Sequence, residues 1–133
     1  MIRYQTTLED ITERDLVGFF VGWPLQPSPE THLSALRGSD VVVLARDVET
    51  GHVVGYITAV GDGALSAFIP LLEVLPDYQE RGIGSELVRR MLSLLEGTYM
   101  IDLCCDEELT GFYERFGMSR WVGMGIRNRA ALA

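Results

Sequence analysis

The chain has 133 residues, 47% of them hydrophobic, which is enough for a single domain with a core of its own. Its formal net charge of −8 at pH 7 argues against a nucleic-acid partner and suits a cationic ligand better. No apolar run has the form of a signal peptide or approaches the length of a membrane span, so we expect a cytoplasmic protein without a membrane partner. Cys104 and Cys105 are adjacent, which favours neither a structural disulfide nor a metal site.

A short strand is expected around Tyr4, and a helix after it. Thr7 and Asp10 have the spacing of a capping box, which starts a helix. Apolar residues then recur on roughly one helical face, at Leu8, Ile11, Leu16, Phe19 and Phe20. The sequence therefore predicts a first helix between residues 7 and 20.

A second helix is predicted after the break at residues 22–27, which contains glycine and proline. Ser28 is placed as its N-cap, Pro29 occupies the first helical position, and Gly38 ends it. Trp23, Glu30 and His32 lie in or beside this region.

Three strands follow, separated by tight turns. Residues 41–45 are apolar throughout, which predicts a strand buried on both faces, and residues 53–60 return as its hairpin partner. The third strand covers residues 65–75. Pro70 falls inside it, and because proline cannot donate to a sheet ladder we expect a bulge or an irregular start there.

The clearest helix begins after Gly82 and Gly84. Its apolar face contains Ile83, Leu87, Val88, Met91, Leu92 and Leu95, and Gly97 is placed to cap its end. A strand over residues 99–104, a helix over residues 107–116 and a last strand over residues 121–127 complete the order of elements. Antiparallel strands followed by a strand–helix–strand unit predict an α+β fold.

The loop between the third strand and this helix is a predicted anion site. The first N–H groups of a helix have no intrahelical partner, and the helix dipole adds positive potential there. Gly82 and Gly84 carry no Cβ, so a phosphate can approach the main chain closely. The loop lacks the Gly-Lys-Ser/Thr of a Walker loop and the third glycine of the dinucleotide fingerprint. A turn without a ligand is the alternative interpretation.

The spacing Gln79-x-x-Gly82-x-Gly84 resembles the acyl-CoA pyrophosphate loop of the GCN5-related N-acetyltransferase (GNAT) superfamily, Arg/Gln-x-x-Gly-x-Gly/Ala. Val74-Leu75-Pro76 looks like the Val-x-Pro strand end of that family, and residues 112–118 resemble its Phe-Tyr-Glu-Lys-x-Gly-Phe signature. The resemblance implies one three-layer α/β/α domain over residues 1–133, with a twisted, mixed and mostly antiparallel sheet of six to seven strands. It also implies acetyl-CoA as co-substrate, no metal, and direct attack by a primary amine of a small molecule or peptide in a ternary complex.

The resemblance also implies which residues hold the cofactor. The CoA pyrophosphate would rest on the backbone amides of Gln79, Glu80, Arg81, Gly82, Ile83, Gly84 and Ser85. The strand end at Val74 and Leu75 offers N–H and C=O groups to the pantetheine amides, as though CoA were an added strand. By motif position, the N–H of Val74 would polarise the thioester carbonyl.

Two side chains are candidates for proton transfer. Tyr113 stands where the family commonly has its general acid, and a phenol with an ordinary pKa of about 10 can donate at neutral pH. The alternative is a core tyrosine beside Phe112 and Phe116. Glu73 interrupts an apolar strand and should point away from the side of Val74, where it would bind or deprotonate the amine. An exposed or ion-paired glutamate is the alternative, and Asp77 is a weaker candidate base.

In the resembling family the first two helices shape the acceptor pocket, so Trp23, Glu30 and His32 are candidate substrate contacts. Core or surface roles compete for each of them, and His32 has the alternative of an ordinary helix-surface residue. Asp106 and Leu109 replace the asparagine and alanine of many family members, which weakens the prediction of activity more than that of the fold. The rival functions are a non-catalytic acyl-CoA-binding or sensing module and a phosphate or nucleotide binder. The expected assembly is a monomer or a homodimer in which C-terminal strands pair.

Overall fold

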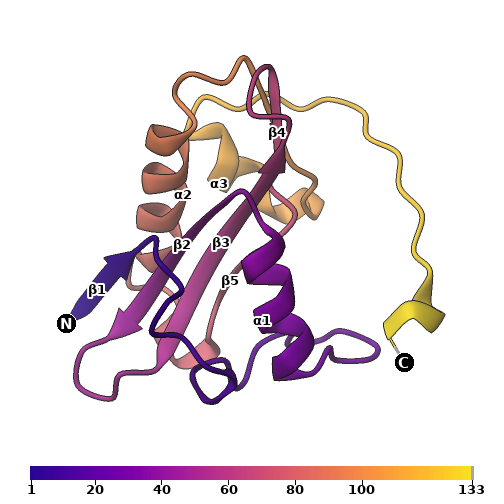
Figure 1. Ribbon diagram of the computed structural model, residues 1–133. Coiled ribbons are helices and arrows are strands. Elements are labelled where there is room, and N and C mark those ends of the chain that lie inside the picture. The colour runs from indigo at the N-terminus through magenta and orange to yellow at the C-terminus, as the bar shows by residue number, and fades with distance from the viewer. Residues whose placement is uncertain (133) are drawn as a thin grey trace.

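In the computed structural model, which describes residues 1–132, the chain forms one sheet with helices on both of its faces (Figure 1). The strands are β1 (Ile2–Gln5), β2 (Val41–Asp47), β3 (Val53–Gly61), β4 (Ser66–Phe68), β5 (Leu72–Val74) and β6 (Met100–Asp102). The α-helices are α1 (Pro29–Gly38), α2 (Ile83–Leu94) and α3 (Thr110–Glu114). Short 3₁₀ turns span Glu13–Asp15, Pro76–Tyr78, Glu107–Leu109 and Arg129–Leu132.

The sheet has the order β1-β2-β3-β4-β6, and β5 pairs with Gly55–Ile57 of β3, closer to the start of that strand than the residues that pair with β4. Every pairing is antiparallel except that of β4 with β6, so the predicted mixed, mostly antiparallel sheet is confirmed. Pro70 lies between β4 and β5, which confirms the expected irregularity, because proline has no N–H to give to the ladder. Within residues 1–132, β6 pairs with β4 alone and no strand pairs with the outer edge of β5.

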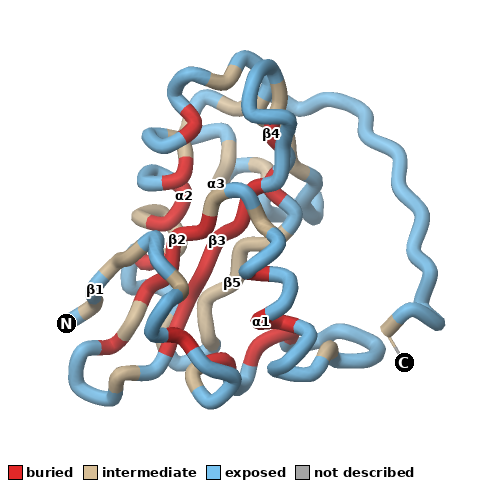
Figure 2. The backbone as a smooth tube through the Cα atoms, in the orientation of Figure 1, coloured by how far each residue is buried: buried red, intermediate tan, exposed pale blue. Residues whose placement is uncertain are grey.

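Two apolar cores lie on opposite faces of β2 and β3, which are buried over most of their length (Figure 2). Residues of α2, among them Leu87 and Met91, pack on one face. Leu33 and Leu36 of α1 pack on the other. The start of α1 is as predicted, because the Oγ of Ser28 accepts a hydrogen bond from the N–H of Thr31 at 3.1 Å and Pro29 is the first helical residue.

The first predicted helix, over residues 7–20, is wrong. The capping interaction lies further on, where the N–H of Thr12 donates to Asp15 Oδ2 at 2.9 Å, and only the 3₁₀ turn Glu13–Asp15 follows it. Gly18, at φ 92°, and Phe20, at φ 63°, lie outside the right-handed helical region. The apolar residues of this segment are nevertheless mostly buried, so their spacing reflects packing on the sheet rather than a helix.

Two further expectations at the C-terminal side are wrong. Residues 121–127 form no strand and are exposed along their whole length (Figure 2). Gly97 does not cap α2, because the helix already ends at Leu94 with Leu95 as its C-cap. α3 likewise ends before Gly117, at Glu114 with Arg115 as its C-cap, but Gly117 does terminate the turn that follows, because its φ of 88° is left-handed and its N–H donates to the carbonyl of Glu114 at 3.0 Å.

Candidate active site

The glycine loop joins β5 to α2 in an unusual backbone conformation. Glu80 has a φ of 63°, and Gly82, the N-cap of α2, is left-handed at φ 82° and ψ 4°. No side chain caps the helix. The first N–H groups of α2, which belong to Ile83, Gly84 and Ser85, are therefore left for an anion. The loop that the sequence predicts as an anion site therefore presents backbone N–H groups at the start of α2, and its binding of an anion stays a prediction.

Side chains of the loop fix its position. The Nε2 of Gln79 donates to the carbonyl of Val74 at 3.0 Å. The hydroxyl of Tyr78 donates to Asp47 Oδ2 at 2.6 Å, and this hydrogen bond lowers the pKa of the Asp47 carboxyl. The guanidinium of Arg81 lies over the Tyr78 ring, 4.9 Å from its centroid. The loop is thus tied to the ends of β2 and β5 before any ligand binds.

β5, α2 and α3 converge at Gly84. A Cβ placed on Gly84 would lie 3.8 Å from the ring of Phe112 and 3.9 Å from Val74 Cγ2. Arg115 reaches the same place, where its Nη2 donates to the Oγ of Ser85 at 3.2 Å and its guanidinium stacks on Phe112 at 5.1 Å. Arg115 is a residue of this site that was not predicted from the sequence. Its position three residues after Phe112 on a helix was the available signal.

Val74 has its N–H on the open edge of β5. The N–H of Leu75 donates to the carbonyl of Val54 at 2.8 Å, and the carbonyl of Leu71 accepts from the N–H of Thr58 at 3.0 Å. Backbone groups alternate in direction along a strand, so Leu71, Glu73 and Leu75 face β3 while Val74 faces outward. The hydrogen bond from Gln79 to the Val74 carbonyl lies on that outer side.

Tyr113 lies in α3, partly buried against the core under α2, with its ring centroid 4.9 Å from that of Phe112. Burial, together with the nearby Cys105, raises the pKa of Tyr113 to about 12. The phenol is therefore protonated at neutral pH. The side chain both packs in the core, as the alternative interpretation held, and carries a proton that it can donate.

Glu73 points to the opposite face of the sheet from Val74, as expected. Its Oε1 accepts from the N–H of Phe20 at 2.9 Å, and its Oε2 accepts from the N–H of Val21 at 3.2 Å. The carboxylate is partly buried, and its partners are backbone amides rather than an arginine. Glu73 thus holds the segment around Phe20, whose left-handed φ of 63° is unusual for a bulky residue.

An aromatic cluster lies next to this carboxylate. His32 is only 1% exposed, and its ring lies 4.7 Å from Phe20 and 4.6 Å from Tyr56. The helix-surface interpretation of His32 is therefore wrong, and burial lowers the pKa of His32 to about 4. Trp23 packs on Phe20 at 4.9 Å and is 41% exposed, so it borders the cluster toward solvent. Glu30 is exposed at the start of α1 and is not part of the cluster.

Burial also acts on Tyr56, which is opposite Glu73 in the register of β3 and β5. Burial raises the pKa of Tyr56 far above its ordinary value, and the charge of Glu73 adds to this. The structure therefore brings Trp23, His32 and Glu73 together through Phe20 and Tyr56. Trp23, His32 and Glu73 were predicted from the sequence as site residues. Phe20 and Tyr56, which connect them, were not.

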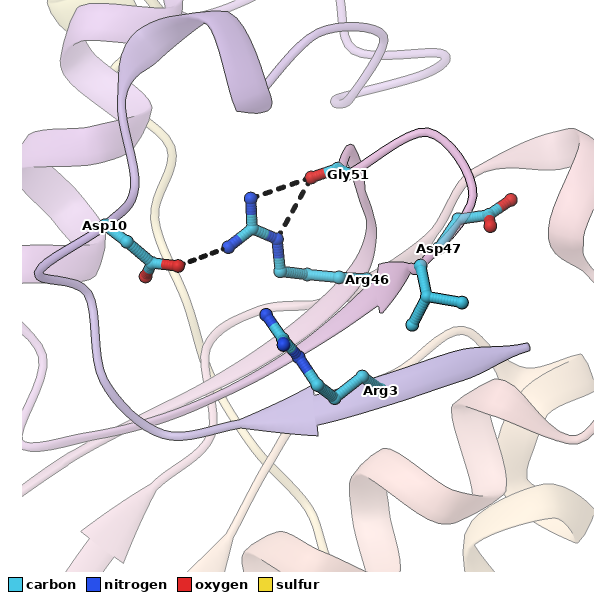
Figure 3. A pocket seen from close by; sticks show the side chains of 6 residues that line it. Arg3, Asp10, Arg46, Asp47 and Gly51 are labelled. Carbon is cyan, nitrogen blue, oxygen red and sulfur yellow. Dashed lines mark hydrogen bonds and ion pairs between the residues drawn. The ribbon is translucent and has the colours of Figure 1, made fainter.

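A separate hollow of about 240 Å³ lies between β1 and the β2–β3 turn (Figure 3). Arg46 lines it and donates to Asp10 Oδ2 at 2.6 Å and to the carbonyl of Gly51 at 3.0 and 2.8 Å. These bonds occupy the guanidinium and tie the segment after β1 to the turn. No residue of the glycine loop and neither Glu73 nor Tyr113 lines this hollow, so we assign it a structural role.

The site thus combines a helix N-terminus that no side chain caps with the open edge of a neighbouring strand, within a mixed sheet that has helices on both faces. The chain belongs to the acetyltransferase (GNAT) family, whose model matches residues 8–118. It is 31% identical over 99 residues to glucosamine 6-phosphate N-acetyltransferase of Schizosaccharomyces pombe, which covers 68% of this chain and 87% of the relative. In three other curated relatives the matched segment spans 46%, 58% and 60% of the whole protein.

Solved structures agree with this assignment. A candidate acetyltransferase of Deinococcus radiodurans is 48% identical with a TM-score of 0.92, over 96% of this chain and 88% of the other. A GNAT-family acetyltransferase of Streptococcus pneumoniae is 35% identical with a TM-score of 0.78, over 97% of this chain and 99% of the other. The predicted superfamily and fold class are therefore confirmed.

Two features are absent from residues 1–132. None of their helices combines the length and the apolar character that crossing a bilayer requires. The same part of the chain contains no group of three or more His, Cys, Asp or Glu side chains placed to hold a metal ion.

Proposed function

We propose that this chain is a single-domain N-acetyltransferase that transfers an acetyl group from acetyl-CoA to a primary amine. The observation that carries the proposal is the junction of β5 and α2, where uncapped helix N–H groups lie beside the outward N–H of Val74. Membership of an acetyltransferase family supports acyl transfer as the reaction. The transfer is a direct attack in a ternary complex.

The cofactor lies along β5 and ends at the glycine loop. Its pantetheine arm lies along the outer edge of β5, where the outward backbone groups are those of Val74, as an added strand does. Leu75 was predicted to share this role, but its N–H donates to the carbonyl of Val54 and its carbonyl accepts from the N–H of Tyr78, so it faces away from that edge. Its pyrophosphate accepts hydrogen bonds from the loop amides of Glu80, Arg81, Gly82, Ile83, Gly84 and Ser85. Gln79 was predicted to join them, but its N–H donates to the carbonyl of Pro76 at 3.3 Å, and its side chain instead holds the Val74 carbonyl. Arg115 adds a cation there, because its guanidinium already touches Ser85.

Two groups act on the thioester. The N–H of Val74 donates to the carbonyl oxygen as it becomes an oxyanion, and Tyr113 donates its proton to the departing CoA thiolate. Because its pKa is about 12, the Tyr113 phenol is protonated at neutral pH and can donate to the thiolate as the C–S bond breaks.

The acceptor amine binds on the face of Glu73. A lysine-like ammonium has an ordinary pKa of about 10.4 and must lose a proton before it attacks. The Glu73 carboxylate can accept about four hydrogen bonds. Two of them come from the backbone N–H groups of Phe20 and Val21. The remaining sites hold the amine and take its proton, directly or through a water. Trp23 borders this site from the solvent side, whereas His32 shapes it from within the core. Glu30 lies outside this cluster, exposed at the start of α1, and stays a candidate acceptor contact.

The acceptor is a small molecule or a peptide amine. The Schizosaccharomyces pombe relative is a glucosamine 6-phosphate N-acetyltransferase, so an amino sugar phosphate is the first acceptor to assay. Peptides with a free amino group are the second class. CoA thiol release reports turnover with either.

Tyr113→Phe tests the catalytic proposal against the rival, a non-catalytic acyl-CoA-binding or sensing module. We expect turnover to fall about 100-fold while CoA affinity is kept, because only the proton is removed. Phe112→Leu is the matched control for packing in the same helix, and it should cost stability more than turnover. Unchanged turnover in Tyr113→Phe would contradict the general-acid role. No turnover by the parent chain with any amine, despite CoA binding, would favour the sensing module.

A further inference from the structure

The segment before α1 leaves a group of apolar side chains exposed. Phe19 and Phe20 of this segment are buried, but the apolar residues around them are between 41% and 62% exposed: Val17, Val21, Trp23 and Leu25. These four residues are called the apolar rim below. Single exposed apolar residues are ordinary on a protein surface, whereas several in one short segment are typical of a binding surface.

Hydrogen bonds hold the apolar rim around the carboxylate of Glu73. The N–H groups of Phe20 and Val21 donate to its two oxygens at 2.9 and 3.2 Å. The carbonyl of Phe20 accepts from the N–H of Trp23 at 3.2 Å and from Nε2 of Gln26 at 3.3 Å. The loop that carries most of the rim is therefore closed onto the same residue that Glu73 binds.

The apolar rim also lies beside the strand that carries the proposed thioester site. A Cβ placed on Gly18, which follows Val17, would lie 3.5 Å from Leu75 Cδ2. Leu75 comes directly after Val74, the last residue of β5. An amine held by Glu73 and the rim is thus next to the end of the strand along which the acetyl donor is proposed to lie.

The charge of Glu73 has no cation paired with it within residues 1–132. Glu73 takes part in none of the salt bridges there, although its carboxylate is partly buried. The sequence from Asp15 to Leu36 contains no arginine, and the whole chain has no lysine. Charged groups that are removed from water are usually paired, so a cation on the ligand would complement this carboxylate.

Two buried polar atoms next to Glu73 also lack a hydrogen-bond partner among the described residues. They are the hydroxyl of Tyr56 and Nε2 of His32, in side chains that are 0% and 1% exposed. Tyr56 is opposite Glu73 in register, so their side chains share one face of the sheet. Buried polar atoms nearly always have a partner, which a ligand or an ordered water beside Glu73 would supply.

The start of α1 is unsuited to a phosphate. A phosphate in a protein usually binds an arginine, a lysine or the free N–H groups of a helix N-terminus. Here the Oγ of Ser28 already accepts from the N–H of Thr31, Pro29 has no N–H, and Glu30 adds a negative charge to the first turn. A phosphorylated acceptor would therefore meet two carboxylates, those of Glu30 and Glu73, without an arginine from residues 15–36.

We propose that the acceptor is a small primary amine with an apolar body and no anionic group. This inference rests on the acceptor site of the proposed function and narrows it to one chemical class. The ammonium donates to the remaining acceptor sites of Glu73, and the apolar body packs on the rim, where Trp23 is the aromatic contact. Both interactions are needed, because the carboxylate selects the charge and the rim selects the body.

Calorimetric titration of the chain with matched small molecules, in the presence and absence of CoA, tests this class without requiring turnover. Phenethylamine has the ammonium and the apolar ring, phenethyl alcohol lacks the charge, and ethanolamine lacks the ring. Glucosamine 6-phosphate, the acceptor named for the Schizosaccharomyces pombe relative, adds a phosphate. We expect phenethylamine to bind at least about tenfold more tightly than each of the other three, since each lacks or opposes one interaction.

Two variants assign the preference to the apolar rim. Trp23→Ser should weaken phenethylamine more than about tenfold and leave ethanolamine unchanged. Leu25→Arg places a cation beside Glu73, so it should weaken phenethylamine and strengthen glucosamine 6-phosphate. Leu94→Arg, at a 52% exposed apolar position of α2, is the matched control and should keep the preference of the parent chain. Circular dichroism checks that each variant is folded.

The inference is overturned if glucosamine 6-phosphate binds as tightly as phenethylamine, if no amine binds, or if Trp23→Ser leaves phenethylamine binding unchanged. Release of CoA thiol in the same samples is read separately. A preference for phenethylamine without any thiol release would contradict the proposed acetyl transfer and still support this ligand class. The failure of either proposal is therefore recognised on its own.

Discussion

Val74 and Glu73 are neighbours on β5, yet they belong to opposite sides of the sheet. Val74 packs in the core under α2, and its N–H lies on the open strand edge. Glu73 faces the segment before α1 and accepts two hydrogen bonds from it. On the first side the site is made of backbone groups whose direction the strand and helix dictate. On the second side it is made of side chains whose positions depend on an irregular segment.

This difference bears on how each side tolerates change. A backbone site needs particular φ values and the absence of Cβ atoms, and many side chains satisfy it. A side-chain site needs the right functional group at each position. We therefore expect substitutions on the α2 side to act through conformation, and those on the α1 side to act through chemistry.

The largest effect is expected from Gly82→Val. A β-branched residue at φ 82° is strained, so the first turn of α2 must shift and its N–H groups lose their common direction. We expect CoA affinity to fall at least about 100-fold, measured by calorimetry. Gly97→Val is the matched control, because a Cβ at Gly97 meets nothing within 4 Å and its φ is not in the left-handed region. If Gly82→Val bound CoA as tightly as the parent chain, the proposed backbone site for the pyrophosphate would be contradicted.

Glu73→Gln tests the chemistry of the other side. The amide keeps the shape but has one acceptor oxygen, so either Phe20 or Val21 is left with an unpaired N–H, at a cost of about 1–3 kcal/mol. We expect turnover to fall about tenfold or more with a higher KM for the amine, while the Kd for CoA stays the same. Asp77→Gln is the control carboxylate. A loss of stability without any change in KM or in the pH profile would leave Glu73 a purely structural residue.

Arg115→Leu should have a smaller effect on the α2 side. It removes one cation from the loop but none of the backbone donors, so we expect the Kd for CoA to rise severalfold and its salt dependence to weaken. Arg89→Leu changes an exposed arginine of α2 that pairs with Glu86, and it should leave the Kd unchanged. The same Kd and salt slope in Arg115→Leu as in the parent would exclude a cofactor contact.

His32 gives the α1 side a pH dependence of stability. Burial lowers its pKa from 6.5 to about 4, so between these values the unfolded chain binds a proton that the folded chain does not. Stability should therefore fall as the pH drops from about 6.5 toward 4, by roughly 2–3 kcal/mol. Thermal melts over this range should show a flatter profile for His32→Phe, and an unchanged one for the exposed His52→Phe. Identical profiles for all three proteins would contradict the buried neutral imidazole.

The same contrast explains what the sequence could predict. The glycine loop, the start of α1 at Ser28 and the break at Pro70 depend on local rules of capping, φ and missing donors, and the structure agrees with each. The segment over residues 7–20 was mispredicted because Gly18 and Phe20 adopt left-handed φ values, which apolar spacing does not reveal. The contact of Glu73 with Phe20 spans 53 positions, and no local pattern encodes it.

The C-terminal tail is a second segment whose structure was mispredicted from the sequence. Residues 121–127 have the composition of a strand, yet a strand needs a partner edge, and within residues 1–132 none is paired with them. Arg115 was missed for a similar reason, since its contact with Ser85 joins two helices that meet only in the fold.

The most direct test of the cofactor site is calorimetric titration of the folded chain with acetyl-CoA, with CoA and ATP as controls. We expect micromolar affinity for both CoA forms and weak binding of ATP, because only CoA offers pantetheine amides to the edge of β5. Equal affinity for ATP and CoA would point to a phosphate or nucleotide binder. No binding of either CoA form would contradict the proposal and leave Gly82 and Gly84 as parts of a turn.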